Sequence, residues 1–219
     1  MDLNLIQEYL SNSDSQKRMK AITELRNYET DIVVPLLKEK INDKEFLVRS
    51  FVAMGLGKKR NAESFAALLQ MMKLDRDPNV RAEAANSLSL FGTVSVPHLV
   101  LMFEQDDHWL VRRSILPALA ELECLEELLE ICICGLHGED QTVREACIDC
   151  LVRLANTSKQ EEALAQLLAL VTDERWRTRM RVARALAKFN TPQAQEALNR
   201  LRQDEDHRVV GAVLESLIS

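Results

Sequence analysis

A short motif recurs along this chain at intervals of about 31 residues. It consists of an acidic residue, several variable positions, and Val-Arg or a close variant that leads into a run of small residues. The marked positions are Arg18, Arg49, Arg81, Arg112, Arg144, Arg179 and Val210; the series is weak at Arg18 and loses its arginine at Val210. A period of this length holds two short helices and two turns, which is the signature of stacked helical repeats.

Each repeat has the pattern of a helical hairpin. Pro35, Pro97 and Pro192 are predicted to open first helices, because the first helical turn has no intrahelical N–H bond to lose. Each second helix is expected to follow an Asp- or Asn-rich turn and to carry apolar residues at helical spacing. Gly57 and Gly92 are predicted to end two of these second helices.

One such hairpin cannot bury its apolar face, so neighbouring hairpins must stack to form a core. We therefore predict an all-α chain: an α-solenoid, or superhelix, of about seven helical hairpins that forms a single domain over residues 1–219. The predicted repeats span approximately 1–29, 30–60, 61–92, 93–122, 123–156, 157–190 and 191–219.

Net charge and composition limit the classes of partner and the cellular compartment that we expect for this chain. The net charge of −6 argues against nucleic acid as the main partner, since phosphate binding needs a basic surface. The stretch from Val94 to Phe103 is too short for a membrane span, and the first residues lack the pattern of a secretory signal. The five cysteines are then expected to be thiols in a reducing compartment. We expect a cytoplasmic protein.

The segment Asp77–Ala85, continuing to Leu88 and Phe91-Gly92, resembles the short HEAT-like repeat of the phycobilin-lyase family, and the resemblance extends over essentially the whole chain. Members include the paired E/F-type lyases that attach bilins to phycobiliprotein cysteines and a phycobilisome-degradation protein. Another is a cyanobacterial HEAT-repeat protein that partners an A-type iron–sulfur scaffold (IscA). No short motif marks the family's catalytic residues, so the resemblance assigns none here.

Deoxyhypusine hydroxylase is similar in repeat type but binds its di-iron centre through His-Glu pairs. The residues that follow the four histidines here are Leu99, Trp109, Gly138 and Arg208. The absence of a His-Glu pair excludes this hydroxylase.

The sixth repeat contains a candidate binding stripe. Arg177, Arg181, Arg184 and Lys188 follow i, i+4, i+7, i+11 spacing, so they share one face of a second helix. Second helices line the concave surface of HEAT solenoids, where this stripe would hold bilin propionates or an acidic partner protein. A solvated charged face beside the C-terminal cap is the alternative. The repulsion between four like charges favours binding.

Two tryptophans and a proline mark further candidates. Trp109 and Trp176 each lie three residues before the repeat arginine, a position that suits a partner hot spot or packing against the neighbouring turn. Pro117 inside a second helix should kink it and free the carbonyl of Arg113, so Arg113 joins the candidate partner-binding residues. The kink would shape a pocket or adjust curvature, and we favour curvature.

All five cysteines fall in the fifth repeat: Cys124, Cys132, Cys134, Cys147 and Cys150. Thiolate clusters hold metals and iron–sulfur centres, so Cys132, Cys134, Cys147 and Cys150 are weak metal candidates. Residues two apart on a helix point about 200° apart, which separates Cys132 from Cys134. Packing of small apolar side chains is the favoured interpretation, with Cys134 the most exposed.

The sequence contains no recognisable catalytic motif, which favours binding over chemistry. The leading hypothesis is a non-catalytic scaffold that holds a client protein on its concave face during cofactor biogenesis of the photosynthetic or iron–sulfur apparatus. The client would be a phycobiliprotein subunit, a second lyase subunit or an iron–sulfur scaffold protein. The alternative is a phycobilin lyase or lyase subunit. No resident cofactor is expected, although the family resemblance leaves a bilin or an iron–sulfur cluster open.

Overall fold

The computed structural model describes residues 1–216; the last three residues of the seventh predicted repeat, 217–219, lie outside the described residues. Over the described part the chain is all-α, with fourteen α-helices, three short 3-10 helices and no strand. The predicted fold class is confirmed: the helices pack as an α-solenoid of helical hairpins.

The α-helices alternate between two roles. The first helices of the hairpins are α1 (Leu3–Leu10), α3 (Thr30–Lys38), α5 (Ala62–Leu74), α7 (Val96–Gln105), α9 (Leu125–His137), α11 (Gln160–Ala169) and α13 (Pro192–Leu201). The second helices are α2 (Ser15–Glu24), α4 (Phe46–Lys58), α6 (Pro78–Ser89), α8 (Trp109–Ala120), α10 (Gln141–Leu151), α12 (Trp176–Leu186) and α14 (His207–Ser216).

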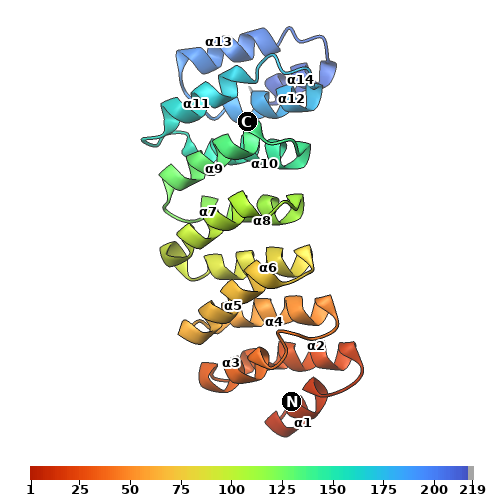
Figure 1. Cartoon of the computed structure of the whole chain (residues 1–219). Coiled ribbons are helices and arrows are strands. Elements are labelled where there is room, and N and C mark those ends of the chain that lie inside the picture. Colours follow the sequence, from red (N-terminus) through yellow and green to blue (C-terminus); the bar gives the residue numbers. More distant parts are fainter. Residues whose placement is uncertain (217–219) are drawn as a thin grey trace. The chain divides into compact units, whose positions relative to one another are not determined.

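The chain divides into two compact units, the N-unit (Met1–Leu122, α1 to α8) and the C-unit (from Glu123 onward, α9 to α14). Figure 1 shows the hairpins of each unit stacked in chain order. Within each unit the second helices pack against one another more extensively than the first helices do. The second-helix layer is therefore the tighter, inner layer of each stack.

The repeat motif explains the local structure. The valine of each Val-Arg pair points into the core, and Val48, Val80, Val111 and Val143 are almost completely buried. Asparagine and aspartate cap the helices that follow turns: Asn61 forms a reciprocal capping box with Ser64, and Asp77 accepts the Asn79 N–H. Apolar periodicity and capping thus place the start and the buried face of these helices.

The prolines follow the prediction in two of three cases. Pro97 and Pro192 lie in the first turns of α7 and α13. The prediction for Pro35 is wrong, because α3 begins at Thr30 and Pro35 lies inside it. Pro117 is also an interior residue, and α8 remains a continuous helical segment through it. Both proline rings are exposed, so neither helix sacrifices a buried contact to accommodate them.

The two glycines differ. Gly92 lies just beyond α6 with a φ of 80°, a left-handed conformation that favours glycine and fits the predicted helix end. Gly57 does not end α4, which continues to Lys58. A Cβ at Gly57 would lie 2.7 Å from the Cβ of Ser87, so this glycine lets α4 and α6 approach closely. None of the described helices is long and apolar enough to cross a membrane.

Candidate functional site

The repeat arginines form a ladder of buried ion pairs inside each unit. Five of these side chains each reach an aspartate of the next repeat, at N···O distances of 2.6–3.5 Å. The pairs are Arg18–Asp43, Arg49–Asp75 and Arg81–Asp106 in the N-unit, and Arg144–Asp173 and Arg179–Asp204 in the C-unit. Arg18, a weak member of the motif in the sequence, is a full member of the ladder.

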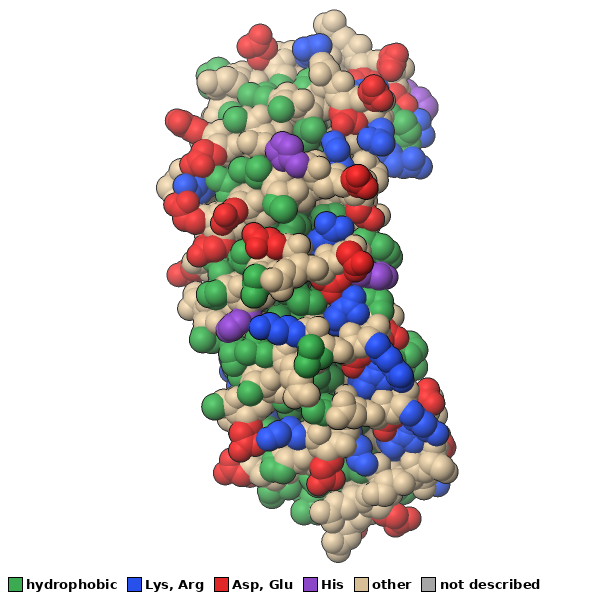
Figure 2. Space-filling model, in the orientation of Figure 1, with side chains coloured by type: hydrophobic (Ala, Val, Ile, Leu, Met, Phe, Trp, Pro, Cys, Tyr) green, Lys and Arg blue, Asp and Glu red, His purple; other side chains and the backbone are tan. Residues whose placement is uncertain are grey.

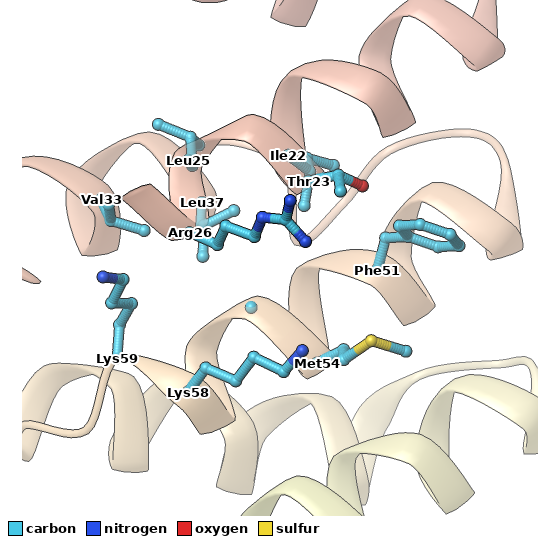
Figure 3. A pocket seen from close by; sticks show the side chains of 11 residues that line it. Ile22, Thr23, Leu25, Arg26, Val33, Leu37, Phe51, Met54, Lys58 and Lys59 are labelled. Carbon is cyan, nitrogen blue, oxygen red and sulfur yellow. The ribbon is translucent and has the colours of Figure 1, made fainter. Parts of the chain in front are cut away.

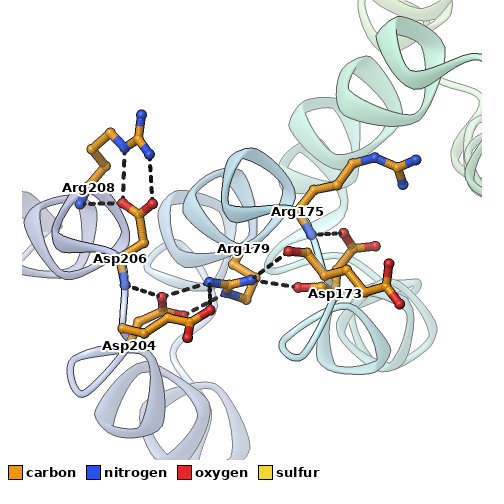
Figure 4. A network of polar contacts seen from close by, with 8 residues as sticks. Asp173, Arg175, Arg179, Asp204, Asp206 and Arg208 are labelled. Carbon is orange, nitrogen blue, oxygen red and sulfur yellow. Dashed lines mark hydrogen bonds and ion pairs between the residues drawn. The ribbon is translucent and has the colours of Figure 1, made fainter.

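The Arg179 pair shows how one guanidinium joins two repeats (Figure 4). Its Nε and Nη2 donate to the two carboxylate oxygens of Asp204 at 2.7 and 2.9 Å, while Nη1 donates to the backbone carbonyl of Asp173 at 2.8 Å. The hydrogen bonds from Arg179 hold the pKa of Asp204 below its usual value. A bidentate, buried pair of this kind fixes the spacing between hairpins. The arginine column thus has a structural role in these pairs.

Three residues of the predicted basic stripe, Arg177, Arg181 and Arg184, lie on one face of α12, whereas Lys188 lies in the turn after the helix, which ends at Leu186. Arg177, Arg184 and Lys188 are exposed and Arg181 is half-buried. Arg181 donates to Glu145 at 3.1 Å and to Asp149, both on α10. Arg184 pairs with Glu215 of α14 at 3.2 Å.

These ion pairs change the electrostatics of the stripe. Carboxylates from both neighbouring second helices hold Arg181 and Arg184, which offsets the repulsion that the cations of the stripe would otherwise feel. The Arg184 pair is exposed and is easily exchanged for a partner's carboxylate. The most available cationic groups are therefore Arg177, Arg184 and Lys188.

The two tryptophans have different surroundings. The Trp176 ring lies between two guanidinium groups, with Arg177 at 4.7 Å and Arg208 at 3.4 Å from its centroid. Arg208 is itself held by Asp206 at 2.7 Å, so this cation–π stack joins α12 to the first turn of α14. Trp109 stacks on His108 and remains 39% exposed. Arg113 is exposed on α8. Of the two rings, Trp109 is the more accessible.

Three of the five cysteines come together between α9 and α10. The Cys132 thiol hydrogen-bonds with Cys147 and Cys150, and these contacts together with burial raise its pKa. Cys124 is also buried, which raises its pKa to about 11, with a further contribution from the charge of Glu127. Cys134 is exposed and stays apart from the three, as its helical phase predicts. The raised pKa values keep the buried Cys124 and Cys132 thiols protonated, and they pack as small apolar groups.

Within the described residues no group of three or more His, Cys, Asp or Glu side chains is arranged to hold a metal ion. The structure thus unites Cys132, Cys147 and Cys150 but leaves the fourth candidate, Cys134, outside the cluster.

One surface was missed by sequence reasoning. On α4 the side chains of Leu47, Phe51, Met54 and Lys58 hold the same positions relative to Arg49 as the basic stripe holds relative to Arg179. Leu47 is 47% exposed and Met54 39% exposed. The signal in the sequence was an α4 segment with apolar residues on every side, more than a half-buried helix needs.

A pocket of about 140 Å³ opens beside this α4 surface, between α2, α3 and α4 (Figure 3). Apolar side chains form most of its wall: Ile22, Leu25, Val33, Leu37, Phe51 and Met54. Arg26, Lys58 and Lys59 supply cationic groups. The space-filling view of one face shows hydrophobic and basic side chains adjoining on the N-unit, with acidic side chains among them (Figure 2).

The family model for HEAT repeats matches residues 3–89, 34–120 and 125–218, which together cover nearly the whole chain. The chain is a HEAT-repeat protein. The Arg–Asp ladder and the paired helix layers are what this HEAT-repeat protein uses to join its hairpins.

Solved structures agree with this family. The Escherichia coli protein YibA is 16% identical, with a TM-score of 0.61, and the match covers 100% of this chain and 93% of that one. The complex of CpcE and CpcF of phycocyanin lyase from a Nostoc species is 19% identical, with a TM-score of 0.55, covering 100% of this chain and 87% of that one. At these identities the likeness concerns the fold alone. None of the curated proteins matches this HEAT-repeat protein.

Proposed function

We propose that this HEAT-repeat protein is a non-catalytic binding scaffold that holds a client protein on its second-helix layer during cofactor biogenesis of the photosynthetic or iron–sulfur apparatus. The observation that carries the proposal is the α12 stripe. Arg177, Arg181 and Arg184 share one face of α12 and Lys188 follows in the turn after the helix; all of them except the half-buried Arg181 are exposed. HEAT repeats commonly mediate protein interactions, and an acidic client surface suits this stripe.

The structure supports a rigid platform for such a client. The buried Arg179–Asp204 ion pair links α12 to the next repeat, and the Arg181–Glu145 ion pair links α12 to α10. A stripe fixed in this way loses little conformational freedom when a client binds, which increases affinity at a given number of contacts. Charged residues at such a surface act mainly on the rate and specificity of association.

The test is a charge reversal of the exposed end of the stripe. The client is first identified by purification of the protein from its native host with cross-linking, and the two purified proteins are then titrated. Replacing Arg184 and Lys188 together by Glu should weaken client binding by about tenfold or more, with the larger part of the change in the association rate at low salt. The matched control is Arg200→Glu with Arg202→Glu, two exposed cations at the end of α13.

Equal client affinity in both double variants would contradict the proposal. Circular dichroism and urea unfolding of each variant establish that the fold is intact. The pairs at this end of α12 are exposed, so we expect no unfolding.

The second candidate function is a phycobilin lyase or lyase subunit. The similarity in fold to the complex of CpcE and CpcF of phycocyanin lyase favours it. Here the α12 stripe would pair with bilin propionates. An absorbance spectrum of the natively purified protein separates these functions. A band in the orange or red supports bilin handling, a broad brown band supports an iron–sulfur cluster, and a colourless protein with one stoichiometric partner supports the scaffold.

A further inference from the structure

The pocket beside α4 has a size that limits its occupant. Its volume of about 140 Å³ is close to that of an engineered apolar cavity of about 150 Å³ that takes one benzene molecule. Sites for drug-sized ligands have volumes of roughly 300–1,000 Å³, so a whole tetrapyrrole does not fit inside. One leucine- or phenylalanine-sized side chain does.

The wall of the pocket selects an apolar group. Leu25, Val33 and Leu37 are buried side chains at its floor, while Phe51 and Met54 of α4 form a rim that reaches solvent. Leu47 continues the apolar strip one turn earlier on the same face of α4. An incoming side chain would therefore exchange water for apolar contacts on several sides, and its neighbours would lie along Leu47 and Met54.

The charges around the pocket select what flanks that group. None of the described residues that line it is acidic, whereas three are basic. Lys59 is fixed by its hydrogen bond to the carbonyl of Tyr28, and Lys58 interacts with the half-buried Glu83. Arg26 is exposed, and Figure 3 shows its guanidinium extending across the space towards α4. Arg26 is thus the cation best placed for an incoming carboxylate.

From this combination we infer that the α4 groove, formed by Arg26, Leu47, Phe51, Met54 and Lys58, binds an acidic amphipathic segment of a partner protein. One large apolar side chain of the segment enters the pocket, and carboxylates on the next helical turn pair with Arg26 and Lys58. The inference rests on the proposed scaffold function and gives the chemistry of a client segment. The basic residues around the pocket favour an acidic segment, and the pocket volume admits only one large apolar side chain.

The test uses labelled synthetic peptides and the full chain. The probe is a short helical peptide with Leu on one face and Glu at the flanking positions, compared by fluorescence anisotropy with two relatives. One relative has every Glu replaced by Lys, and the other has every Leu replaced by Ala. We expect the acidic Leu peptide to bind at least about tenfold more tightly than either relative.

Two variants locate the binding. Met54→Glu and Arg26→Glu should each weaken the acidic peptide by about tenfold. Leu74→Glu is the matched control, since Leu74 is 76% exposed at the end of α5 and lies outside the groove. Far-ultraviolet circular dichroism and the urea midpoint of each variant show whether it folds like the parent.

The outcomes separate this inference from the proposed function. Equal binding of the Lys peptide, or unchanged affinity in Met54→Glu, overturns the groove. Displacement of the peptide by decanoate at a comparable concentration overturns it in favour of a small amphipathic acid. A client whose binding depends on Arg184 and Lys188 but not on Met54 or Arg26 overturns the groove while the scaffold stands.

Discussion

Helices α4 and α12 are equivalent second helices, one in each unit, but the side chains that they present differ in chemistry. Both carry a ladder arginine, Arg49 or Arg179, that is buried and bidentate to an aspartate of the next repeat. The outer column of α4 (Leu47, Phe51, Met54 and Lys58) is mostly apolar, whereas the outer column of α12 (Arg177, Arg181, Arg184 and Lys188) is entirely cationic.

This difference separates what builds the repeat from what the repeat presents. The ladder recurs, and so does the buried residue before the arginine (valine at Val48, Val80 and Val143, Thr178 before Arg179), because neighbouring hairpins must meet in the same way. The outer column is not part of the ladder, and the contacts that it makes with neighbouring repeats, such as the Arg184–Glu215 pair, differ from repeat to repeat. A surface that differs between equivalent helices can present a different chemistry to a partner at each repeat.

The largest expected effect tests whether the ladder pairs stabilise the N-unit and the C-unit to the same extent. Arg49→Ala and Arg179→Ala each leave a buried aspartate without its guanidinium, and we expect each to lower the free energy of unfolding by about 3 kcal/mol. Urea unfolding followed by circular dichroism measures both. The control is Lys38→Ala, which removes an exposed pair with Glu63 and should change stability by less than about 0.5 kcal/mol. A loss at only one of the two arginines would show that the ladder differs between the units.

A smaller effect is expected where the two helices pack differently. The position of Gly57 in α4 is taken by Ala187 at the end of α12. A methyl group at position 57 would press against the Cβ and backbone of Ser87, so Gly57→Ala should destabilise the protein by about 2 kcal/mol. The double change Gly57→Ala with Ser87→Gly should recover part of the loss. Thermal unfolding of the three proteins checks this, and an unchanged midpoint in Gly57→Ala would mean that α4 and α6 adjust freely.

Much of the ladder was predictable, and most of the surface was not. The spacing of Val-Arg pairs predicted the stack, because periodic burial leaves a periodic sequence. The role of Gly57 was mispredicted, since a glycine that ends a helix and one that allows close approach look alike in one sequence. The prediction for Pro35 was wrong for a related reason. An exposed proline inside a helix keeps a helical φ and removes only one hydrogen bond, so α3 continues through it.

The candidate site shows the same limit. Helical phase placed Arg177, Arg181 and Arg184 on one face of α12, but the acidic partners of Arg181 and Arg184 come from helices about one repeat away in the chain. The groove beside α4 also needs side chains from other elements, such as Arg26 of the 3-10 helix after α2 and Val33 of α3. Contacts between repeats depend on the angle and distance at which hairpins stack, and a linear pattern does not contain those quantities.

The pH dependence of stability should have opposite signs at two residues. In the C-unit, hydrogen bonds from Arg179 lower the folded pKa of Asp204, so the stability it contributes is present above its unfolded value near 4 and is lost as pH falls through the folded value. In the N-unit, burial raises the folded pKa of Glu83, so its contribution is present below about 4 and is lost as pH rises through the folded value.

Unfolding free energies measured from pH 2 to 7 check both signs. Asp204→Asn should flatten the acid limb of the profile, and Glu83→Gln should raise stability near neutral pH relative to the parent protein. If the unfolding free energy of Asp204→Asn falls with decreasing pH as steeply as that of the parent protein, the Arg179–Asp204 pair is not the source of the acid sensitivity.

The smallest expected effect is the one that decides whether the outer columns are free to vary. Met54 and Arg184 hold the same position in their repeats, five residues after the ladder arginine. Met54→Arg gives α4 the residue that α12 has at this position, and Arg184→Met gives α12 the residue that α4 has. Met54 is 39% exposed and Arg184 forms only an exposed pair with Glu215, so each change should alter the free energy of unfolding by less than about 0.5 kcal/mol. Urea unfolding of the two single variants and of the double exchange measures this. A loss above about 1.5 kcal/mol in either helix would make its outer column part of the packing, because a surface position that only presents a side chain to partners tolerates this exchange.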